Sequence, residues 1–394
     1  MKSNYDILGN HIRLIDDRNN DLVTDQVLGI NIDKFFMPSV ANIIGTDLSK
    51  YKLVTKGKFA CNPMHVGRDE RLPIALYEKD TPAIVSPAYF VFEIIDNTIL
   101  DENFLMMWFR RPEFDRICWL HTDGSVRGGI TWEDICRLEM LVPSIEEQKN
   151  MVRAYRAIND RIVLKKQIND NLFTSTNAFF SEKFGSYLCE RMRNTSQYVH
   201  LNKFLKIKHG FAFNSDFFSE EVTKNILISP GNFKIGGGFQ NNKPKYYMED
   251  APYSNDFILS SGSLVVTMTD LSKNGDTLGF PAIIPKDDDI VFLHNQRVGL
   301  VEFTTSELPK AFIYFLMCST DYRNYILSTA SGTTVRHTSP QKILQYGFIM
   351  PENCEDLKEL SCMFEIYVRY SNNLNREIKL LAKMESLLLS KLVN

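Results

Sequence analysis

The sequence predicts an α+β protein made of two tandem copies of one plan, each a mixed α/β globule followed by a long helix. Three observations predict this class. Matching segments recur in the same order at an offset of about 208 residues. Short runs rich in β-branched and aromatic residues are separated by Gly, Pro, Asn and Asp, which indicates strands and turns. Two stretches of about 40 residues contain no proline and are compatible with unusually long helices.

The repeat is recognised from segments that keep both their order and their spacing. Each match alone could arise by chance, but the shared order favours a tandem duplication, and a duplication kept only for stability is the alternative. The matched segments are 104–108 with 312–316, 124–127 with 332–336, 141–143 with 349–351, and 180–183 with 388–391.

Within each copy, the first 140 to 165 residues are predicted to form the globule. Strands are expected in the β-rich runs, and a short apolar helix follows near Glu102–Arg110 in the first copy and Pro309–Cys318 in the second. The β-rich runs are 26–30, 83–95, 263–268 and 289–303.

The long helices are predicted to pair with each other as an antiparallel coiled coil. In the second, apolar residues alternate in steps of three and four over about five heptads, and the first helix carries a weaker version of the same pattern. Antiparallel pairing would bring residues 164 and 374 together and place Lys165 and Asn169 near Ser371 as a polar layer. Two separate surface helices are the alternative. The seam residues expected to matter are Tyr155, Ile158, Ile162, Leu172, Leu360, Phe364, Tyr367, Leu374, Ile378, Leu381 and Leu388.

Composition excludes several classes of protein. The chain has 394 residues, 24% charged and 44% hydrophobic, which is ordinary for a soluble globular protein. No apolar run reaches the roughly 18 residues of a membrane helix, and the N-terminus shows no secretion signal. The seven cysteines lie far apart without a CxxC pair, so neither disulfides nor a zinc site is expected and a cytoplasmic location is predicted.

Catalytic motifs are missing from the sequence. Asn62-Pro63-Met64-His65 is the nearest string to the motif of adenine methyltransferases, but it lacks the second proline and the aromatic residue. Gly236–Gly238 lacks the spacing of a phosphate-binding loop, and the seven histidines show no metal-binding pair. The acidic run Asp287–Asp289 is interpreted as a solvated turn. The chain is therefore predicted to be non-catalytic and to bind neither metal nor cofactor itself.

Several motifs together resemble the specificity (S) subunit of type I restriction–modification systems. The block Gly124–Ile135 leads into Leu141–Gln148 in the way that this family ends a recognition domain and begins a helix. In the second copy, Met268–Leu271, Gly279–Ala282 and Leu293–Val298 are similar to a common type of second recognition domain. The resemblance covers essentially the whole chain, and it implies target-recognition domains at 1–143 and 185–350 with conserved spacer helices at 144–184 and 351–394.

The resemblance implies a function in defence against foreign DNA. Each recognition domain would read one half of a split, asymmetric target in double-stranded DNA, and the helices would set the spacer and dock two modification subunits. Those partners would methylate adenine with S-adenosylmethionine, and restriction subunits would add ATP- and Mg-dependent translocation and cleavage. The alternative from another class is a coiled-coil scaffold or adaptor whose duplicated domains bind protein.

Side-chain chemistry indicates the candidate DNA-binding residues, because Arg and Lys suit guanine or phosphate while Asn and Gln suit adenine. In the first copy they lie after the Phe59 strand and in the recurring Gly–Arg motif, for which an ordinary surface loop and a domain-closing turn are the alternatives. The first-copy candidates are Asn62, Met64, His65, Arg68, Arg71, Ser125 and Arg127. The second-copy candidates are Lys206, Lys208, His209, Thr267, Thr269, Lys273, Asn274, Gln296, Arg297, Thr333 and Arg336.

The net charge of −3 is unusual for a nucleic-acid binder. It divides into −5 for residues 1–143, +2 for 144–184, +1 for 185–350 and −1 for 351–394, so no region is strongly basic. This pattern is compatible with a subunit that reads bases while its partners supply much of the backbone grip.

Overall fold

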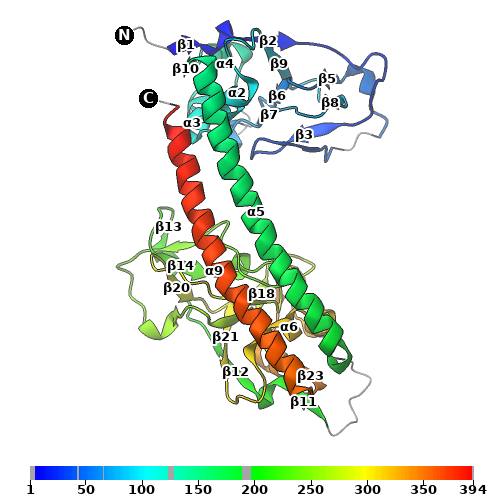
Figure 1. Ribbon diagram of the computed structural model, residues 1–394, viewed down its shortest axis with the longest axis vertical. Helices are drawn as coiled ribbons and strands as arrows, with labels where there is room; N and C mark the ends of the chain where they lie inside the picture. The colour runs from blue at the N-terminus through cyan, green and yellow to red at the C-terminus, as the bar shows by residue number, and fades with distance from the viewer. Residues whose placement is uncertain (1–4, 42–43, 65, 123–127, 189–196, 393–394) are drawn as a thin grey trace. The chain divides into compact units, whose positions relative to one another are not determined.

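The computed structural model describes residues 5–41, 44–64, 66–122, 128–188 and 197–392 (Figure 1). The chain divides into two compact units, here called unit 1 (Met1–Val163 with Lys379–Asn394) and unit 2 (Leu164–Ile378). In the part of the chain that the structure describes, no helix is both long and apolar enough to cross a membrane.

Unit 1 is built on a four-stranded antiparallel sheet. One face packs on helices α2 (Glu102–Phe109) and α3 (Pro112–Leu120), and the other covers a smaller core with two strand pairs. The sheet order is β2 (Ile12–Ile15), β9 (Phe90–Ile94), β6 (Phe59–Cys61) and β7 (Ile74–Leu76). The strand pairs are β3 (Leu28–Ile30) with β4 (Phe36–Pro38) and β5 (Lys52–Val54) with β8 (Ala83–Val85). The remaining elements are β1 (Tyr5–Ile7), which pairs with β10 (Glu139–Leu141), α1 (Val66–Asp69), α4 (Trp132–Cys136) and short helices at Leu8–Asn10 and Leu48–Lys50.

Unit 2 repeats this plan and adds a second sheet. Its four-stranded sheet has the order β12 (Leu205–His209), β21 (Val298–Phe303), β17 (Leu264–Thr267) and β19 (Pro281–Ile283). The second sheet has the order β13 (Phe218–Ser219), β15 (Tyr246–Tyr247), β14 (Asn225–Ile228), β20 (Val291–His294) and β16 (Ile258–Leu259). The helices are α6 (Lys310–Cys318), α7 (Thr320–Thr329) and α8 (Pro340–Leu344), with short helices at 185–188, 201–203, 215–217, 230–232 and 255–257. Two further pairs are β11 (Tyr198–His200) with β23 (Gly347–Ile349) and β18 (Thr269–Asp270) with β22 (Arg336–His337).

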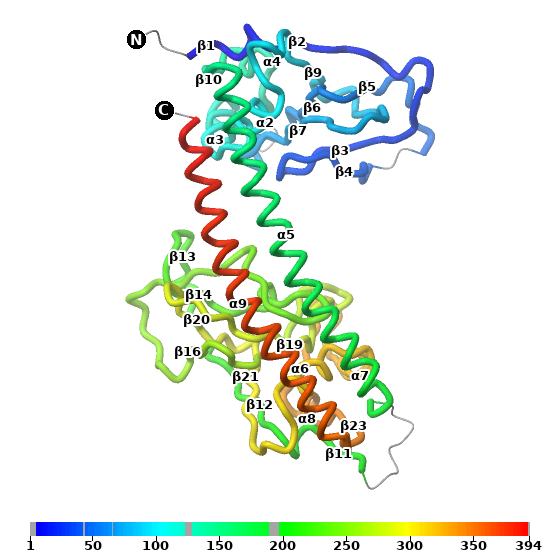
Figure 2. The backbone as a smooth tube through the Cα atoms, in the orientation of Figure 1, coloured from blue at the N-terminus to red at the C-terminus, as the bar shows by residue number. Residues whose placement is uncertain are grey.

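The two units share their topology, which confirms the predicted tandem duplication. The sheet order β2-β9-β6-β7 in unit 1 corresponds strand by strand to β12-β21-β17-β19 in unit 2. Helices α2, α3 and α4 of unit 1 correspond in chain order to α6, α7 and α8 of unit 2 (Figure 2). The β-rich runs 83–95 and 289–303 each divide into two strands joined by a turn. The additional five-stranded sheet of unit 2 is the main departure from the shared plan.

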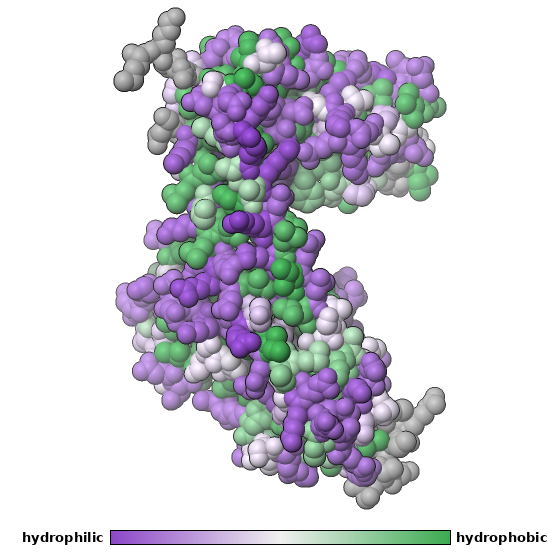
Figure 3. Space-filling model, in the orientation of Figure 1, coloured by the Kyte–Doolittle hydropathy of each residue, from purple (hydrophilic) through white to green (hydrophobic). Residues whose placement is uncertain are grey.

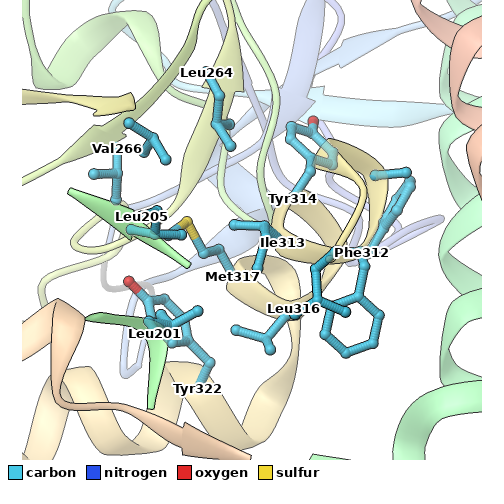
Figure 4. Packing of buried hydrophobic residues seen from close by; sticks show 14 of the residues in the cluster. Leu201, Leu205, Leu264, Val266, Phe312, Ile313, Tyr314, Leu316, Met317 and Tyr322 are labelled. Atoms are coloured by element: carbon cyan, nitrogen blue, oxygen red, sulfur yellow. The ribbon is translucent and has the colours of Figure 1, made fainter. Parts of the chain in front are cut away.

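The main core of unit 2 lies between its four-stranded sheet and α6. Ile313 and Met317 of α6 point toward Leu205 of the sheet (Figure 4). Phe312 packs against Phe180 of the long helix α5 (Ile145–Phe184), with the two ring centroids 5.5 Å apart. All of these side chains are buried to 1% exposure or less, so removing such a large apolar side chain would leave a cavity. The equivalent residues Phe104–Trp108 of α2 form the main core of unit 1, as the repeat predicts.

The two long helices begin at polar capping residues. Helix α5 (Ile145–Phe184) follows Ser144, whose hydroxyl accepts from the Glu147 amide at 3.4 Å while the Glu147 carboxylate accepts from the Ser144 amide at 3.0 Å. This reciprocal pair is a capping box. Helix α9 (Cys354–Ser390) follows Asn353, whose side-chain oxygen accepts from the Glu355 amide at 3.0 Å.

Helices α5 and α9 run antiparallel, as the heptad pattern predicts (Figure 1). In unit 2, Lys183 pairs with Asp356 at 3.8 Å, and the rings of Phe173 and Tyr367 lie 5.9 Å apart. In unit 1, residues of both helix segments share one core: Val152 and Tyr155 from α5, and Leu389 and Leu392 from α9. Every one of the predicted seam residues is buried or half-buried.

The predicted polar layer is present in the unit 2 part of the helix pair. Lys165 forms an ion pair with Glu377, and Asn169 and Ser371 line the same small cavity of about 30 Å³. The side-chain oxygen of Asn169 is buried and has no hydrogen-bond partner in the described protein atoms. A polar layer of this kind lowers stability but fixes the register of two helices.

Replacing Lys165 and Asn169 with leucine should raise the melting temperature, because an unsatisfied buried polar atom is replaced by apolar packing. We expect the free energy of unfolding to increase by about 1 to 2 kcal/mol, while the helix register becomes less well defined. Thermal and denaturant unfolding measure the change, and exposed Lys166→Leu on the same helix is the matched control. A lower melting temperature for the double variant would contradict the polar-layer interpretation.

Candidate nucleic-acid interface

Each unit brings two loops together at one end of its four-stranded sheet. The inner loop joins the third and fourth strands of the sheet, and its described residues are 62–64 and 66–73 in unit 1 and 268–280 in unit 2. The outer loop precedes α4 or α8, and its described residues are 121–122 and 128–131 in unit 1 and 330–339 in unit 2. These two loops carry most of the residues that the sequence singles out.

The same backbone contact joins the loops in both units. In unit 2 the Thr338 amide donates to the Met268 carbonyl at 3.0 Å, and strands β18 and β22 pair beside it. In unit 1 the Ile130 amide donates to the Pro63 carbonyl at 3.1 Å. Since Ile130 and Thr338 are equivalent in the repeat, the junction is a shared feature of the two copies.

Asp270 organises the inner loop of unit 2. Its carboxylate accepts hydrogen bonds from the Ser272 amide at 2.7 Å and from the Thr277 hydroxyl at 2.6 Å, and it also accepts from the Thr277 amide. Burial raises the pKa of Asp270, but these hydrogen bonds outweigh burial and leave the pKa below its usual value. Asp270 therefore stays ionised at neutral pH and closes the loop on itself.

The side chains between Ser272 and Thr277 project from this closed loop. Lys273 and Asn274 are exposed, and neighbouring Leu271 is 66% exposed. From the outer loop, Thr333 is exposed and Arg336 is half-buried, with its Nε donating to the Lys273 carbonyl at 3.1 Å. The structure thus brings four of the predicted residues together on one surface.

A third segment, the turn between β20 and β21, joins the same end of the unit 2 sheet. The Met268 amide donates to the Arg297 carbonyl at 3.0 Å, and the Gln296 amide donates to the Phe211 carbonyl at 2.9 Å. Gln296, Arg297 and the nearby His209 at the end of β12 are exposed. The predicted residues His209, Gln296 and Arg297 therefore flank the inner loop.

Lys206 and Lys208 lie along β12 rather than at the junction. Both are exposed, and the Lys208 amine lies 5.8 Å from the Phe257 ring and 3.4 Å from the Asp256 carbonyl. Their positions extend positive charge along the edge of the sheet.

Thr267 and Thr269 are occupied within the fold. Thr267 is fully buried and its hydroxyl donates to the Thr269 carbonyl at 2.9 Å. Thr269 is 5% exposed, and its hydroxyl lies 3.2 Å from Nδ1 of His337 in the outer loop. Both threonines therefore shape the junction between the loops and do not belong to its exposed surface.

The inner loop of unit 1 presents a different set of side chains. Asn62 is half-buried, and its side-chain oxygen accepts from the Met64 amide at 3.1 Å. Met64 is 46% exposed. Arg68 pairs with Asp69 at 2.6 Å and Arg71 with Asp33 at 3.1 Å. Exposed pairs of this kind are weak, so both guanidinium groups can exchange partners. The predicted residues His65, Ser125 and Arg127 lie outside the described residues.

A buried ion pair beneath the unit 1 inner loop was missed by sequence reasoning. Lys34, 5% exposed, lies 2.8 Å from the Asp115 carboxylate on α3, which also accepts from the Leu72 amide at 3.1 Å. Burial lowers the pKa of Lys34, and the neighbouring Asp115 carboxylate opposes that shift. The partners are 81 residues apart, and neither has a local sequence signal.

The outward faces of the long helices carry exposed apolar residues that are not part of the seam. In unit 1, Leu380, Met384 and Leu387 of α9 are 53 to 57% exposed and follow helical spacing. In unit 2, Ile168 of α5 and Tyr370 of α9 are 47% and 49% exposed. Figure 3 shows such apolar surface in green among hydrophilic surface.

The unit 2 junction exposes several side chains that can contact nucleic acid. Lys273 and Arg297 are cationic, and Asn274 and Gln296 carry amides, which can contact phosphates and base edges. In the part of the chain that the structure describes, no group of His, Cys, Asp and Glu is placed to hold a metal ion.

No family model matches this chain, and no curated protein matches it. Solved structures are similar to it. The S subunit of a type I restriction–modification system from M. genitalium superposes with a TM-score of 0.56 at 13% identity, covering 98% of this chain and 95% of that one. A chain from a structure on complex assembly and conformational transition of the type I R-M system gives a TM-score of 0.44 at 13% identity, covering 98% and 96%. The HsdS subunit from Thermoanaerobacter tengcongensis gives 0.36 at 12% identity, covering 98% and 95%.

The first of these similarities confirms the fold that the sequence motifs predict. The chain has the fold of a type I S subunit over nearly its full length.

Proposed function

We propose, from the fold that it shares with a type I S subunit, that this chain is the DNA sequence-specificity subunit of a type I restriction–modification complex. The observation that carries the proposal is the repeated junction of inner and outer loops at the same end of the same sheet in both units. A duplicated surface with different side chains in each copy is what reading two unlike half-sites requires.

The inner loops are assigned to base reading. Asn62 in unit 1 and Asn274 in unit 2 carry the paired donor and acceptor that match adenine in the major groove. Lys273 and Arg297 carry donors that match guanine, and Gln296 matches adenine. Because the two inner loops differ in these residues, the two half-sites differ in sequence and the target is asymmetric.

The outer loops and the β12 edge are assigned to the phosphate backbone. Arg336 and Thr333 form one such contact, and Lys206 and Lys208 extend it along the sheet edge. Such contacts place the protein on the duplex without reading sequence. The unit 1 region has a net charge of −5, so partner subunits are expected to supply much of the affinity there.

The long helices are assigned to spacing and docking. In this proposal they set the distance between the half-sites and bind two modification subunits, and restriction subunits complete the complex. The exposed apolar residues of α9 and α5 support a protein-binding face, because the seam residues are buried in the helix pair. Adenine methylation with S-adenosylmethionine, and ATP- and Mg-dependent cleavage, belong to those partners.

Selection from a library of randomised DNA duplexes tests the proposed function. The 394-residue chain, prepared with a type I modification subunit, is expected to enrich two short motifs separated by a spacer of fixed length and no sequence preference. An adaptor whose globules bind protein would enrich no sequence, and that result would reject the proposal.

Replacing Asn62 with alanine should relax the preference at one base position of the first half-site. Loss of one paired base contact lowers discrimination there by about 1 to 3 kcal/mol, and all positions of the second half-site should stay unchanged. The same duplex selection measures the change. Exposed Asn97, which lies in the turn after β9 away from the inner loop, is the matched alanine control. Unchanged specificity in the Asn62 variant would reject the assigned role.

A further inference from the structure

We propose that Arg323 on α7 and Asp115 on α3 are positioning residues, each of which holds the inner loop of its own unit in the conformation that reads DNA. The two residues are equivalent in the repeat, being 208 positions apart on corresponding helices. The inference rests on the proposed function and adds to it the residues that set specificity from beneath the contact surface.

In unit 2, Arg323 binds the returning limb of the inner loop. Its two terminal nitrogens donate to the Leu278 and Gly275 carbonyls, and its guanidinium lies 4.7 Å from the Phe280 ring. A guanidinium presents its donors in a rigid planar fork, so two bonds to two carbonyls fix the position and the orientation of that limb together. Burial lowers the pKa of Arg323 and the charges of Asp270 and Asp276 oppose that shift.

The segment of the inner loop that Arg323 binds, residues 275–280, is closely packed against its neighbours. Gly275 and Gly279 have positive φ angles of 65° and 81°. A Cβ on Gly279 would approach Ile326 of α7 to 2.9 Å, and one on Gly275 would approach Arg336 to 3.4 Å. The inner loop is therefore pressed between α7 and the outer loop.

This packing connects Arg323 to the side chains assigned to DNA. Asn274 precedes Gly275, whose carbonyl Arg323 binds, and the neighbouring Lys273 carbonyl accepts from Arg336. Movement of the Gly275 carbonyl would therefore shift Lys273, Asn274 and Arg336 together, although Arg323 itself is not at the exposed tip.

In unit 1, Asp115 also binds the backbone of the inner loop, but it accepts a hydrogen bond from an amide where Arg323 donates to carbonyls. Its carboxylate accepts from the Leu72 amide, at the point where the inner loop returns to β7, and pairs with Lys34. Lys34 also donates to the Phe109 carbonyl, so it ties the β3–β4 turn to α2. Arg71, a predicted contact residue, directly precedes Leu72 and pairs with Asp33 of that turn.

Because each bond lies wholly within one unit, the two loops are set independently. Disturbing Arg323 should alter reading of the second half-site only, and disturbing Asp115 should alter reading of the first half-site only. A general loss of folding predicts no such separation.

The test compares matched variants of the 394-residue chain, prepared with a type I modification subunit, on the same library of randomised duplexes. Arg323→Met removes both carbonyl bonds, whereas Arg323→Lys keeps a donor. In unit 1, two double variants are compared: Lys34→Met/Asp115→Ala and Lys34→Met/Asp115→Asn. Asparagine keeps an acceptor for the Leu72 amide, whereas alanine does not. Both variants also replace Lys34, so neither leaves an unpaired buried charge.

The readout is the ratio of enrichment between matched and singly mismatched half-sites, which is insensitive to the fraction of folded protein. We expect Arg323→Met to lower this ratio about tenfold in the second half-site, with partial recovery in Arg323→Lys and no change in the first half-site. In the two unit 1 double variants, the ratio should fall in the first half-site and stay unchanged in the second. The fall should be larger with Asp115→Ala than with Asp115→Asn.

Wild-type discrimination by Arg323→Met, or equal loss in both half-sites, would overturn the inference while leaving the proposed function intact. Should Arg323→Met not fold, the unit 1 pair and Arg323→Lys decide the question by the same ratio. If the wild-type protein enriches no sequence, the proposed function fails and the inference fails with it.

Discussion

Replacing Asp115 with asparagine should lower the free energy of unfolding by about 3 to 5 kcal/mol, the usual result of removing one member of a buried ion pair. Lys34 is 5% exposed and lies 2.8 Å from the carboxylate, so the variant leaves a buried ammonium group without its counter-charge. Denaturant unfolding of the full-length chain measures the loss.

Two further variants test whether the loss of stability comes from the burial of the ion pair. Asp80, which pairs with Lys56 at 2.8 Å, has a side chain that is 88% exposed, and Asp80→Asn should change stability little. Replacing Lys34 and Asp115 together with Met and Leu should recover much of the loss, since apolar replacement of a whole buried pair is often neutral. Wild-type stability of Asp115→Asn would show that the pair is not buried as described.

Replacing Arg336 with alanine should weaken binding to every duplex, whatever its sequence. Loss of one phosphate contact lowers the dependence of log affinity on log salt by about one unit. Fluorescence anisotropy over a series of salt concentrations measures both quantities. The Arg336 Nε donates to the Lys273 carbonyl, which orients the guanidinium beside the inner loop.

Arg369→Ala is the matched control for this effect. Arg369 is exposed on α9, outside both loops, and its replacement by alanine removes the same charge from the chain. Its replacement should leave the salt dependence unchanged. A change of preference at a single base in Arg336→Ala, with no general loss of affinity, would show that Arg336 reads sequence instead.

The pairing of the long helices and the duplication of the globule could be predicted because both produce repeated spacings in the sequence. Heptad spacing in residues 357–392 predicts a paired helix, and matching the mid-points of the two long helices predicts that they run antiparallel. The observed helix α9 pairs in the expected register, with Asn169 and Ser371 beside the same cavity. The repeat offset predicts equivalent helices, and α2 and α6 confirm it. These signals survive in a single sequence because each extends over many residues.

The details of the candidate interface could be predicted only in part. The residue types of the inner loops were recognised, but the burial of Thr267 was not, because a threonine at a strand end has no local signature of exposure. Arg323 and the Lys34–Asp115 pair act through partners that lie 45 to 81 residues away in the sequence. Such contacts depend on tertiary packing, which neither spacing nor composition encodes.

The charge of the chain is distributed differently at the loops of the two units. The net −3 is concentrated in residues 1–143, where Arg68 and Arg71 each pair with an acidic neighbour. At the unit 2 junction, by contrast, Lys273, Arg297 and Arg336 gather within one surface. We therefore expect the second half-site to contribute more of the backbone affinity that this chain supplies.

The central claim is that the two units read the two halves of one split DNA target. Methylome sequencing of cells that carry this gene, compared with otherwise identical cells lacking it, tests the claim most directly. We expect methylated adenine at a single asymmetric motif of two short specific parts and a fixed non-specific spacer, present only with the gene. Identical methylation patterns in the two strains, with a type I modification subunit expressed in both, would contradict the proposed role.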